Sequence, residues 1–453
     1  MTVNKNKMKT KDIIATTLAK MATLMTLAAA MVTPATLVAQ GGFNIPYSQY
    51  GIGSDELCLP VAERMGGAIL TRSASNYINP MNPASYAGIE KESFVFDMGL
   101  NLQANRLRQG DATSRAADGN IGYLSIGMPL TGWWKVAAGL MPYSTVDYLS
   151  TVAGSDGAET EYFGSGGVNR IFAGMAFNIP AGKTTRVQAG FNVNYLTGRI
   201  GRAISYTFAG NDTTYHINSR KDKTTTVSNV TFDFGVQAWQ KMGQNLTLGI
   251  GLSYKPYMDM TASDEALIYT FAADETIVDT IFPSRGQATG FSSRLEQPRT
   301  VGVGLSLQVG KRWLVAADAT FAAWSGMRYT EDPSHAIFGA DAVSYGPTSR
   351  YALGVERLGN MDASTYWGRI GWSVGAHTAL DVLQITVGGA EHRLNAWGVG
   401  AGISLPMRKG RSLLTLSLSY SSMGTPDVVR REALTVGIAV SSCERWFVKR
   451  KYN

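Results

Sequence analysis

The sequence has little charge, little cysteine and little histidine, and its single long apolar stretch lies near the N-terminus. Charged residues make up 17% of the 453 residues, with two cysteines and four histidines. Beyond the first forty residues no apolar run approaches the roughly 20 residues that a membrane-spanning helix requires. A helical membrane protein is therefore excluded.

Catalytic motifs are also lacking. The four histidines are scattered, mostly in expected loops, without metal-ligand spacing (His216, His335, His377 and His392). We find no nucleophile elbow, HExxH motif or P-loop in a fitting context. Gly398–Gly402 superficially resembles a nucleotide loop, but it alternates as a strand with small residues facing a crowded lumen. We predict no enzyme, no metal and no cofactor. Acidic residues such as Asp97, Asp233 and Asp318 are interpreted as lumen charges.

The first 39 residues have the composition of a secretory signal peptide. Lysines precede an apolar, small-residue stretch from Met21 to Ala39. The alternative, a retained anchor helix, is disfavoured because Thr33-Pro34 interrupts the run. Residues 1–39 hold five lysines and one aspartate, so their removal lowers the 41 basic and 34 acidic residues to 36 and 33. The net charge falls from +7 to +3, and a nucleic-acid partner is not supported.

The two cysteines, Cys58 and Cys443, lie far apart in the chain. A disulfide between them is compatible with an oxidising compartment, but two unpaired structural cysteines fit the sequence equally well.

A clear strand pattern begins at Ser93. From Phe94 to Ala104 every second residue is apolar, and the intervening residues are polar or glycine apart from Val95. Strand side chains alternate between two faces, so this segment predicts a strand with one apolar and one polar face. The lead-in before it, residues 40–91, is rich in Gly, Pro, Ser and Asn and has no sustained period.

Similar alternating runs continue to the C-terminus, and we count fourteen. They are Glu92–Arg106, Gly119–Pro129, Trp133–Pro142, Val168–Pro180, Thr185–Phe208, Thr226–Lys241, Asn245–Met258, Arg299–Gly310, Lys311–Ser325, Ser349–Arg357, Thr365–Ala376, Asn395–Pro406, Arg411–Ser421 and Glu432–Ser441.

The length of these runs suits a membrane. Tilted strands of about 9–11 residues cross a bilayer, and aromatic residues such as Trp133, Trp313 and Trp372 gather at run ends, as interfacial girdles do. Because lipid leaves no backbone group unpaired, the strands should close on themselves. We predict an all-β fold, a transmembrane antiparallel β-barrel of about 14 strands in the bacterial outer membrane. A large soluble β-sandwich, the alternative, would need shorter strands.

The connections alternate in length. Short ones such as Met242–Gln244 alternate with long polar ones over Ala209–Thr225, Asp259–Pro298 and Gly326–Thr348. This alternation is typical of short periplasmic turns and long outer loops.

With a barrel predicted, the sequence resembles the FadL/TodX family of outer-membrane transporters for hydrophobic compounds, in its Bacteroidetes-type form. Asn82-Pro83-Ala84, within residues 79–87, is similar to the family's hatch motif. Leu295–Pro298 and the strand Arg312–Ser325, with Asp318, Trp324 and Ser325, are similar to a family pattern of a proline before a strand that ends in Trp-Ser. Arg445–Tyr452 resembles the tail of related proteins. Cys58 is not part of the pattern.

After the predicted signal peptide of residues 1–39, the resemblance implies a hatch over residues 40–91 that plugs the lumen and a barrel over residues 92–453. A hydrophobic small molecule, with long-chain fatty acids as candidates, would enter from outside and leave sideways between strands into the lipid bilayer. Asn82, Pro83 and Ala84 would then bind or gate the ligand. The alternative is that they only terminate the plug.

A second function from another class stays open. The same barrel would serve as an interaction scaffold or an accessory protein in secretion, with a protein partner. A continuous apolar pocket between hatch and wall would favour transport, and a filled lumen with large ordered outer loops would favour the scaffold.

Overall fold

The computed structural model describes residues 59–154, 157–208, 217–272, 274–282, 290–324, 343–360, 363–387, 390–407 and 412–445. The short helices are α2 (Pro60–Glu63), η1 (Pro83–Gly88) and α3 (Tyr366–Arg369). The strands are β1 (Ser93–Gln109), β2 (Ala112–Pro129), β3 (Trp134–Thr145), β4 (Tyr148–Ala153), β5 (Ala158–Pro180), β6 (Thr185–Phe208), β7 (Asn218–Met242), β8 (Leu246–Lys255), β9 (Met258–Phe271), β10 (Ile277–Phe282), β11 (Gly290–Gln297), β12 (Thr300–Val309), β13 (Trp313–Ala322), β14 (Val343–Tyr345), β15 (Thr348–Arg357), β16 (Gly371–Val387), β17 (Ala390–Met407), β18 (Ser412–Thr425) and β19 (Val429–Arg445). None of the described helices has the length and apolarity needed to span a membrane.

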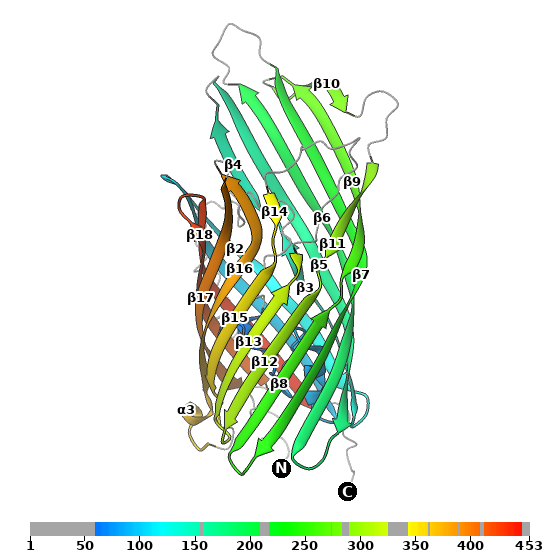
Figure 1. Cartoon of the computed structure of the whole chain (residues 1–453), viewed down its shortest axis with the longest axis vertical. Helices are drawn as coiled ribbons and strands as arrows, with labels where there is room; N and C mark the ends of the chain where they lie inside the picture. The colour runs from blue at the N-terminus through cyan, green and yellow to red at the C-terminus, as the bar shows by residue number, and fades with distance from the viewer. Residues whose placement is uncertain are drawn as a thin grey trace, which may run out of the picture. The chain divides into compact units, whose positions relative to one another are not determined.

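The strands form one antiparallel sheet that closes on itself (Figure 1). The closing ladder joins β1 to β19 and runs from Ser93 opposite Arg445 to Arg108 opposite Arg430. Several segments are pieces of one wall strand. For example, β8 and β9 both pair with β7, and β3 and β4 both pair with β5. Counted as wall strands, the barrel has fourteen, which confirms the predicted number and fold class.

The outward faces of the strands are apolar and the inward faces are polar or small. On β8, Leu248, Ile250 and Leu252 are exposed, whereas the intervening Gly249 and Gly251 face the lumen. This arrangement suits a wall that contacts lipid outside and a filled lumen inside. Val95, the exception in the β1 pattern, is fully buried because it packs against residues 59–91 inside the barrel.

Aromatic side chains form girdles at two heights, as predicted. Near the short turns, Trp313 and Trp372 meet edge to face with ring centroids 5.4 Å apart. Toward the other end of the strands, Trp397 lies 5.6 Å from Tyr420. Aromatic rings favour the two membrane interfaces, so the wall between these levels marks the membrane-spanning band. The short turns, at the lower end of Figure 1, identify the periplasmic side.

Some predicted boundaries are wrong. Strands β5, β6 and β7 have 23, 24 and 25 residues, so the predicted runs Val168–Pro180 and Thr226–Lys241 begin about ten residues late. The predicted loop Asp259–Pro298 is largely strand, in β9, β10 and β11. Outside the bilayer both strand faces meet water and the apolar alternation disappears. Alternation therefore does not predict these outer parts of the strands.

The predicted run Thr365–Ala376 is also wrong at its start. Tyr366–Arg369 is helix α3, and the Thr365 side chain caps it by accepting a hydrogen bond from the Gly368 N–H. The strand β16 begins only at Gly371. Apolar residues at alternate positions of this segment imitated a strand.

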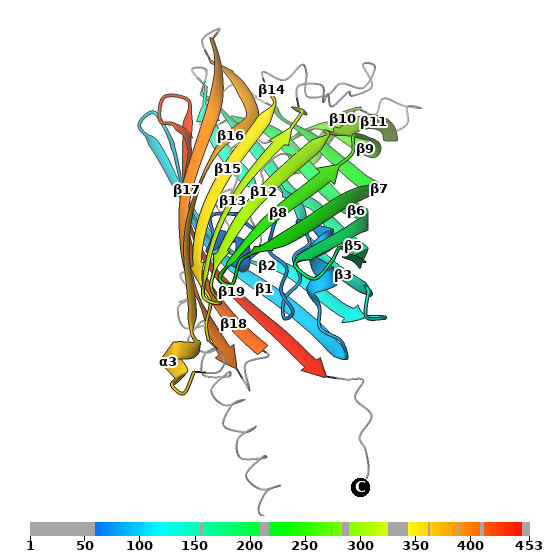
Figure 2. The same ribbon diagram turned by 60° about the horizontal axis from the view of Figure 1, so that its bottom comes forward.

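Residues 59–91, which we call the lumen segment, lie inside the barrel (Figure 2). Most of its side chains are buried, and it forms only the short helices α2 and η1. Irregular backbone is tolerated at membrane depth when protein surrounds it. Residues 1–39 and 40–58, the predicted signal peptide and the first part of the predicted hatch, lie outside the described residues.

Candidate functional site

Asn82, the first residue of the predicted hatch motif, ties the lumen segment to the barrel wall. Its side chain is fully buried, and its amide nitrogen donates to the Leu70 carbonyl at 2.9 Å and to the Leu252 carbonyl of β8 at 3.2 Å. Its oxygen accepts from the Ala84 N–H at 3.2 Å, which caps η1. Pro83 fixes the first position of that helix, where a missing N–H costs nothing.

The tripeptide can lie this close to the wall because glycines face it. A Cβ added to Gly235 of β7 would lie 2.1 Å from Asn82 Oδ1, and one added to Gly190 of β6 would lie 2.6 Å from the Pro83 carbonyl carbon. Asn82, Pro83 and Ala84 thus form an anchor, and they do not line the cavity described below. Their predicted ligand or gating role stays a prediction.

Asp318 of β13 is a second anchor. Its carboxylate, 7% exposed, accepts the backbone N–H groups of Ile69 at 2.5 Å and Leu70 at 2.7 Å. Trp324, from the same predicted motif, is buried in an apolar cluster of the wall, and Ser325 lies outside the described residues. Within this motif Asp318 anchors the lumen segment and Trp324 packs against apolar side chains.

No sequence pattern indicated the third anchor. The Glu356 carboxylate of β15 forms two ion pairs. Its Oε1 lies 2.8 Å from Arg64 Nη2 and its Oε2 lies 2.8 Å from Arg72 Nη2, and all three side chains are largely buried. Burial lowers the pKa of Arg72, but the Glu356 carboxylate and Tyr77 raise it, and the net pKa lies above the ordinary value. Only the closed barrel brings these residues together, because nearly 300 positions separate them in the chain.

A fourth anchor uses Asp97 of β1, which the sequence placed on a lumen face. Its carboxylate accepts from the Ile78 N–H at 3.1 Å, the Tyr123 hydroxyl at 2.9 Å and the Ser441 hydroxyl at 2.8 Å. Asp97 and Asp318 therefore serve as lumen charges, as predicted, and both hold backbone N–H groups of the lumen segment.

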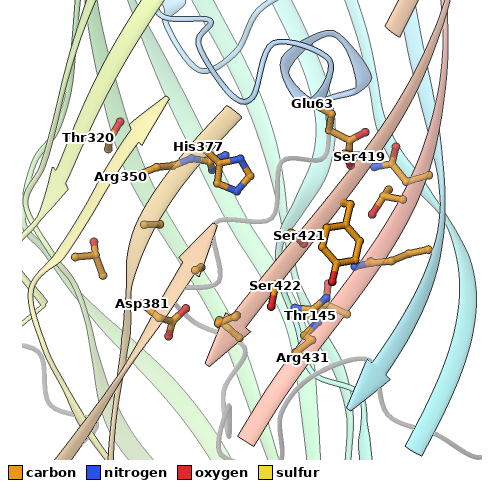
Figure 3. A pocket seen from close by; sticks show the side chains of 18 of the residues that line it. Glu63, Thr145, Thr320, Arg350, His377, Asp381, Ser419, Ser421, Ser422 and Arg431 are labelled. Atoms are coloured by element: carbon orange, nitrogen blue, oxygen red, sulfur yellow. The ribbon is translucent and has the colours of Figure 1, made fainter. Parts of the chain in front are cut away.

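A cavity of about 200 Å³ lies in the lumen beside Glu63 of α2 (Figure 3). Its lining mixes hydroxyl, amide and charged side chains with apolar ones. Arg350 and His377 line one part, and Arg431 another. His377 is on β16 and His392 on β17, so the expectation that the histidines lie mostly in loops is wrong for these two. Within the described residues, no group of His, Cys, Asp or Glu is arranged to hold a metal.

On its outer side the cavity borders apolar side chains. Tyr143 and Met423 line the cavity and also pack against what we call the outer apolar cluster. That cluster comprises Val146, Tyr148, Val168, Leu196, Ile200, Val227, Met260, Ala262, Leu295, Ala322, Trp324, Val382, Leu383, Ile385, Leu394, Val428 and Val429. Apolar side chains of the outer apolar cluster therefore border the cavity on this side.

The wall beside the cavity is interrupted. Strands β2 and β3 pair only from Leu124 opposite Leu140 to Pro129 opposite Lys135. Farther out, Ala112–Tyr123 of β2 pairs with β1 alone, while Met141–Thr145 and β4 pair with β5. Over this stretch of the described chain no ladder joins the two edges. We call this feature the wall gap.

Local sequence explains the wall gap. Pro142 has no N–H to give to a ladder, and the register of β3 shifts between Pro142 and Ser144. On the opposite edge, Gly122 is an extra residue, because Gly99 pairs with Tyr123 and Leu100 with Ile121. The cavity lining includes Asn120 from one edge and residues 142–145 from the other.

The sequence left open whether Cys58 and Cys443 form a disulfide. Cys443 of β19 is buried, and its thiol donates to the Ser75 carbonyl at 3.6 Å, while Cys58 lies outside the described residues. The glycines of Gly398–Gly402 belong to β17 and face a crowded lumen as predicted, with a Cβ on Gly400 only 2.1 Å from the Glu63 carbonyl oxygen.

The closed fourteen-stranded barrel, with its buried lumen segment, has the fold of the FadL/TodX barrels. The Pseudomonas putida toluene transporter TodX superposes with a TM-score of 0.54 at 16% identity, covering 85% of this chain and 97% of that one. The CymD monoaromatic hydrocarbon channel gives 0.50 at 13% identity, covering 88% and 99%. At identities this low, the two superpositions establish the shared fold alone.

The family follows from sequence. Residues 21–453 match the family model described as BamG, and the chain belongs to the BamG family. No curated protein matches it. The predicted resemblance to FadL/TodX barrels is confirmed for the fold, and the Bacteroidetes-type form stays a prediction.

Proposed function

We propose that this barrel takes up hydrophobic small molecules across the outer membrane, with long-chain fatty acids as candidate ligands, and releases them sideways through the wall gap. The observation that carries the proposal is the wall gap itself, because the cavity lining includes residues from both of its unpaired edges. A lipophile that leaves there passes from protein into lipid without crossing a watery pore.

The outer apolar cluster supports the same route. A ligand arriving from outside would first meet apolar side chains and then the cavity, whose Tyr143 and Met423 offer apolar contact. The lumen segment, held by Asp318, Glu356 and Asp97, closes the path toward the periplasmic side. With that path closed, we infer that a ligand leaves the cavity through the wall gap.

The experiment obstructs the wall gap. Asn120→Trp and Ser144→Trp place large side chains on its two edges, and Ile126→Trp, on the lipid-facing side of β2 where the ladder is intact, is the matched control. We expect uptake of a fluorescent fatty acid by cells to fall about tenfold for the edge variants and to stay unchanged for the control. Unchanged uptake in the edge variants, with no lipophile in native mass spectra of the wild type, would refute the proposal.

A second candidate function, an interaction scaffold, is favoured by a different observation. Strands β5, β6 and β7 are about twice as long as a bilayer requires. They stay paired over their outer parts and project as a sheet from the upper end of the barrel (Figure 1). Transport of a small molecule does not require such a surface, whereas docking of a protein does.

Shortening the projecting sheet separates the two functions. Arg199 of β6 pairs with Thr226 of β7, so replacing residues 200–225 by an Asn-Gly turn keeps the register below. A scaffold predicts loss of a stoichiometric partner from detergent-extracted complexes with fatty-acid uptake retained. A transporter without a partner predicts no change in the co-purifying proteins. Heat-dependent mobility in gel electrophoresis verifies that the barrel still folds.

A further inference from the structure

The lipid-facing surface of β2, β1 and β19 ends abruptly in arginine. Along β1 the outward residues Leu100, Leu102 and Ala104 are apolar, and the next ones, Arg106 and Arg108, are cationic. The register places the same change on both neighbouring strands. Ala104 lies opposite Ala117 and Leu434, and one step farther out Arg106 lies opposite Arg115 and Glu432.

The next outward pair continues the pattern, since Arg108 lies opposite Arg430 of β19. Directly opposed residues of antiparallel strands share one face. We call these side chains the arginine patch: Arg106, Arg108, Arg115 and Arg430. The β1–β2 turn and the β18–β19 turn above it lie side by side (Figure 2), joined by the Gly110 N–H to the Pro426 carbonyl at 2.9 Å.

The arginine patch carries more positive charge than its own carboxylate compensates. Glu432 Oε1 lies 3.0 Å from Arg430 Nη2, and Glu432 Oε2 lies 3.8 Å from Arg106 Nη1. Arg115 stands opposite Arg106, and like charges directly opposed across strands are destabilising. An anion at this place would relieve the repulsion.

The position of the arginine patch relative to the membrane indicates which anion it would meet. The apolar surface of β1 lies directly below it, and the ring pair of Trp397 and Tyr420 stands at the same interface, with the Tyr420 hydroxyl bonded to Glu432 at 3.3 Å. Lipid head groups occupy this level. Because the patch is on the side away from the short turns, the head groups belong to the outer leaflet.

We propose that the arginine patch binds the phosphate groups of an outer-leaflet glycolipid whose acyl chains lie on the apolar face of β1, β2 and β19. Guanidinium groups suit this ligand because their planar forks bind phosphate oxygens in pairs and remain charged at any physiological pH. The ligand holds a fixed place beside the wall gap, since β2 forms one edge of the gap.

The experiment is native mass spectrometry of the full-length protein in detergent. The probes are diphosphorylated lipid A and the same lipid with both phosphates removed. Arg106→Gln, Arg108→Gln and Arg115→Gln are combined in one variant. The matched control, Lys183→Gln, Lys241→Gln and Lys311→Gln, removes the same charge from exposed positions in or beside the short turns.

We expect the patch variant to bind the diphosphorylated lipid on the order of 100-fold more weakly, from roughly fivefold for each basic side chain at an anionic lipid surface. The lysine control should bind as the wild type does. The dephosphorylated lipid should bind the wild type as weakly as the phosphorylated lipid binds the patch variant.

Glu432→Gln supplies an opposite test. If the arginines merely satisfy Glu432, this change leaves lipid binding unchanged or weaker. If they bind phosphate, it frees Arg106 and Arg430 and tightens binding. Equal affinity for the two lipids, or unchanged binding by the patch variant, would overturn the proposal. Displacement of the lipid by millimolar inorganic phosphate would overturn the assignment to a lipid in favour of a free phosphate ion.

Discussion

Arg72 of the lumen segment lies 2.8 Å from Glu356 of β15, and Arg64 shares the same carboxylate. Two buried cations therefore depend on one buried anion from the opposite part of the chain. Removing one partner of a buried ion pair is costly because the remaining charge keeps its desolvation penalty.

Glu356→Gln should destabilise the folded barrel by about 3–5 kcal/mol. The temperature at which the protein loses its compact mobility in gel electrophoresis measures the effect. Glu391→Gln, at an exposed position of β17, is the control and should leave this temperature unchanged. Equal temperatures for both variants would show that the lumen segment does not depend on Glu356.

Asn82→Ala should loosen the lumen segment from the wall at a cost of about 1–3 kcal/mol, since the hydrogen bonds to the Leu70 and Leu252 carbonyls are lost and only Gln237 still donates to the Leu70 carbonyl. Limited proteolysis between residues 59 and 91 reports the loosening. This variant also tests the predicted gating role. If Asn82 is only an anchor, any change in fatty-acid uptake should scale with the loosening. Altered uptake with unchanged protease resistance would assign it a gating role.

Gly235→Ala should destabilise by about 1–3 kcal/mol, because its Cβ would lie 2.1 Å from Asn82 Oδ1. Gly201→Ala on β6 is the matched control, since its Cβ would meet nothing closer than 3.5 Å. Thermal unfolding of both variants in one detergent checks the difference. Similar unfolding temperatures would mean that the anchor has room to shift.

Cys443 should resist a maleimide reagent in the folded barrel and react once the protein is unfolded, because its thiol is buried against Ser75. A Cys58→Ser background removes the second thiol, and intact mass counts the adducts. Rapid labelling of native protein would contradict the buried position.

The lumen segment also predicts a loss of stability at high pH. Burial raises the pKa of Tyr77, against the opposing effect of Arg72, and burial likewise raises the pKa of Tyr86 above the ordinary value of about 10. A tyrosine whose pKa is raised on folding stabilises the protein fully below its unfolded pKa and loses this contribution as the pH rises toward the folded pKa.

Stability should therefore fall as the pH increases above about 10, and Tyr77→Phe with Tyr86→Phe should flatten that decline. Unfolding temperatures between pH 8 and pH 12, with ultraviolet absorbance of tyrosinate as the second signal, test it. The same decline in the double variant would assign the effect to other groups.

The alternation of apolar and polar residues was the feature of the sequence that best predicted the fold. It predicted the strand between Phe94 and Ala104 and the count of fourteen because lipid on one side and a filled lumen on the other impose opposite demands on successive residues. Where that contrast ends, prediction failed. The outer part of β5 lies in water, and the segment around Tyr366 imitated alternation while forming a helix.

Candidate site residues were predictable only where a motif is local. Asn82-Pro83-Ala84 is a turn that its own atoms specify, since Asn82 caps the helix that Pro83 begins. The sequence also placed Asp97 and Asp318 on lumen faces. Glu356, its two arginines and the cavity carried no recognisable signal, because their neighbours come from distant strands.

The sequence by itself determined a lipid-facing barrel, because strand periodicity and bilayer thickness are local demands that each run meets alone. The tertiary structure decided which acidic residues hold the lumen segment, where the wall is interrupted and where arginines gather. Those features depend on which distant strands the barrel brings together, and the β1–β19 ladder completes that arrangement. A slip of one residue in a wall strand would turn its anchor, such as Asp97, Asp318 or Glu356, toward lipid.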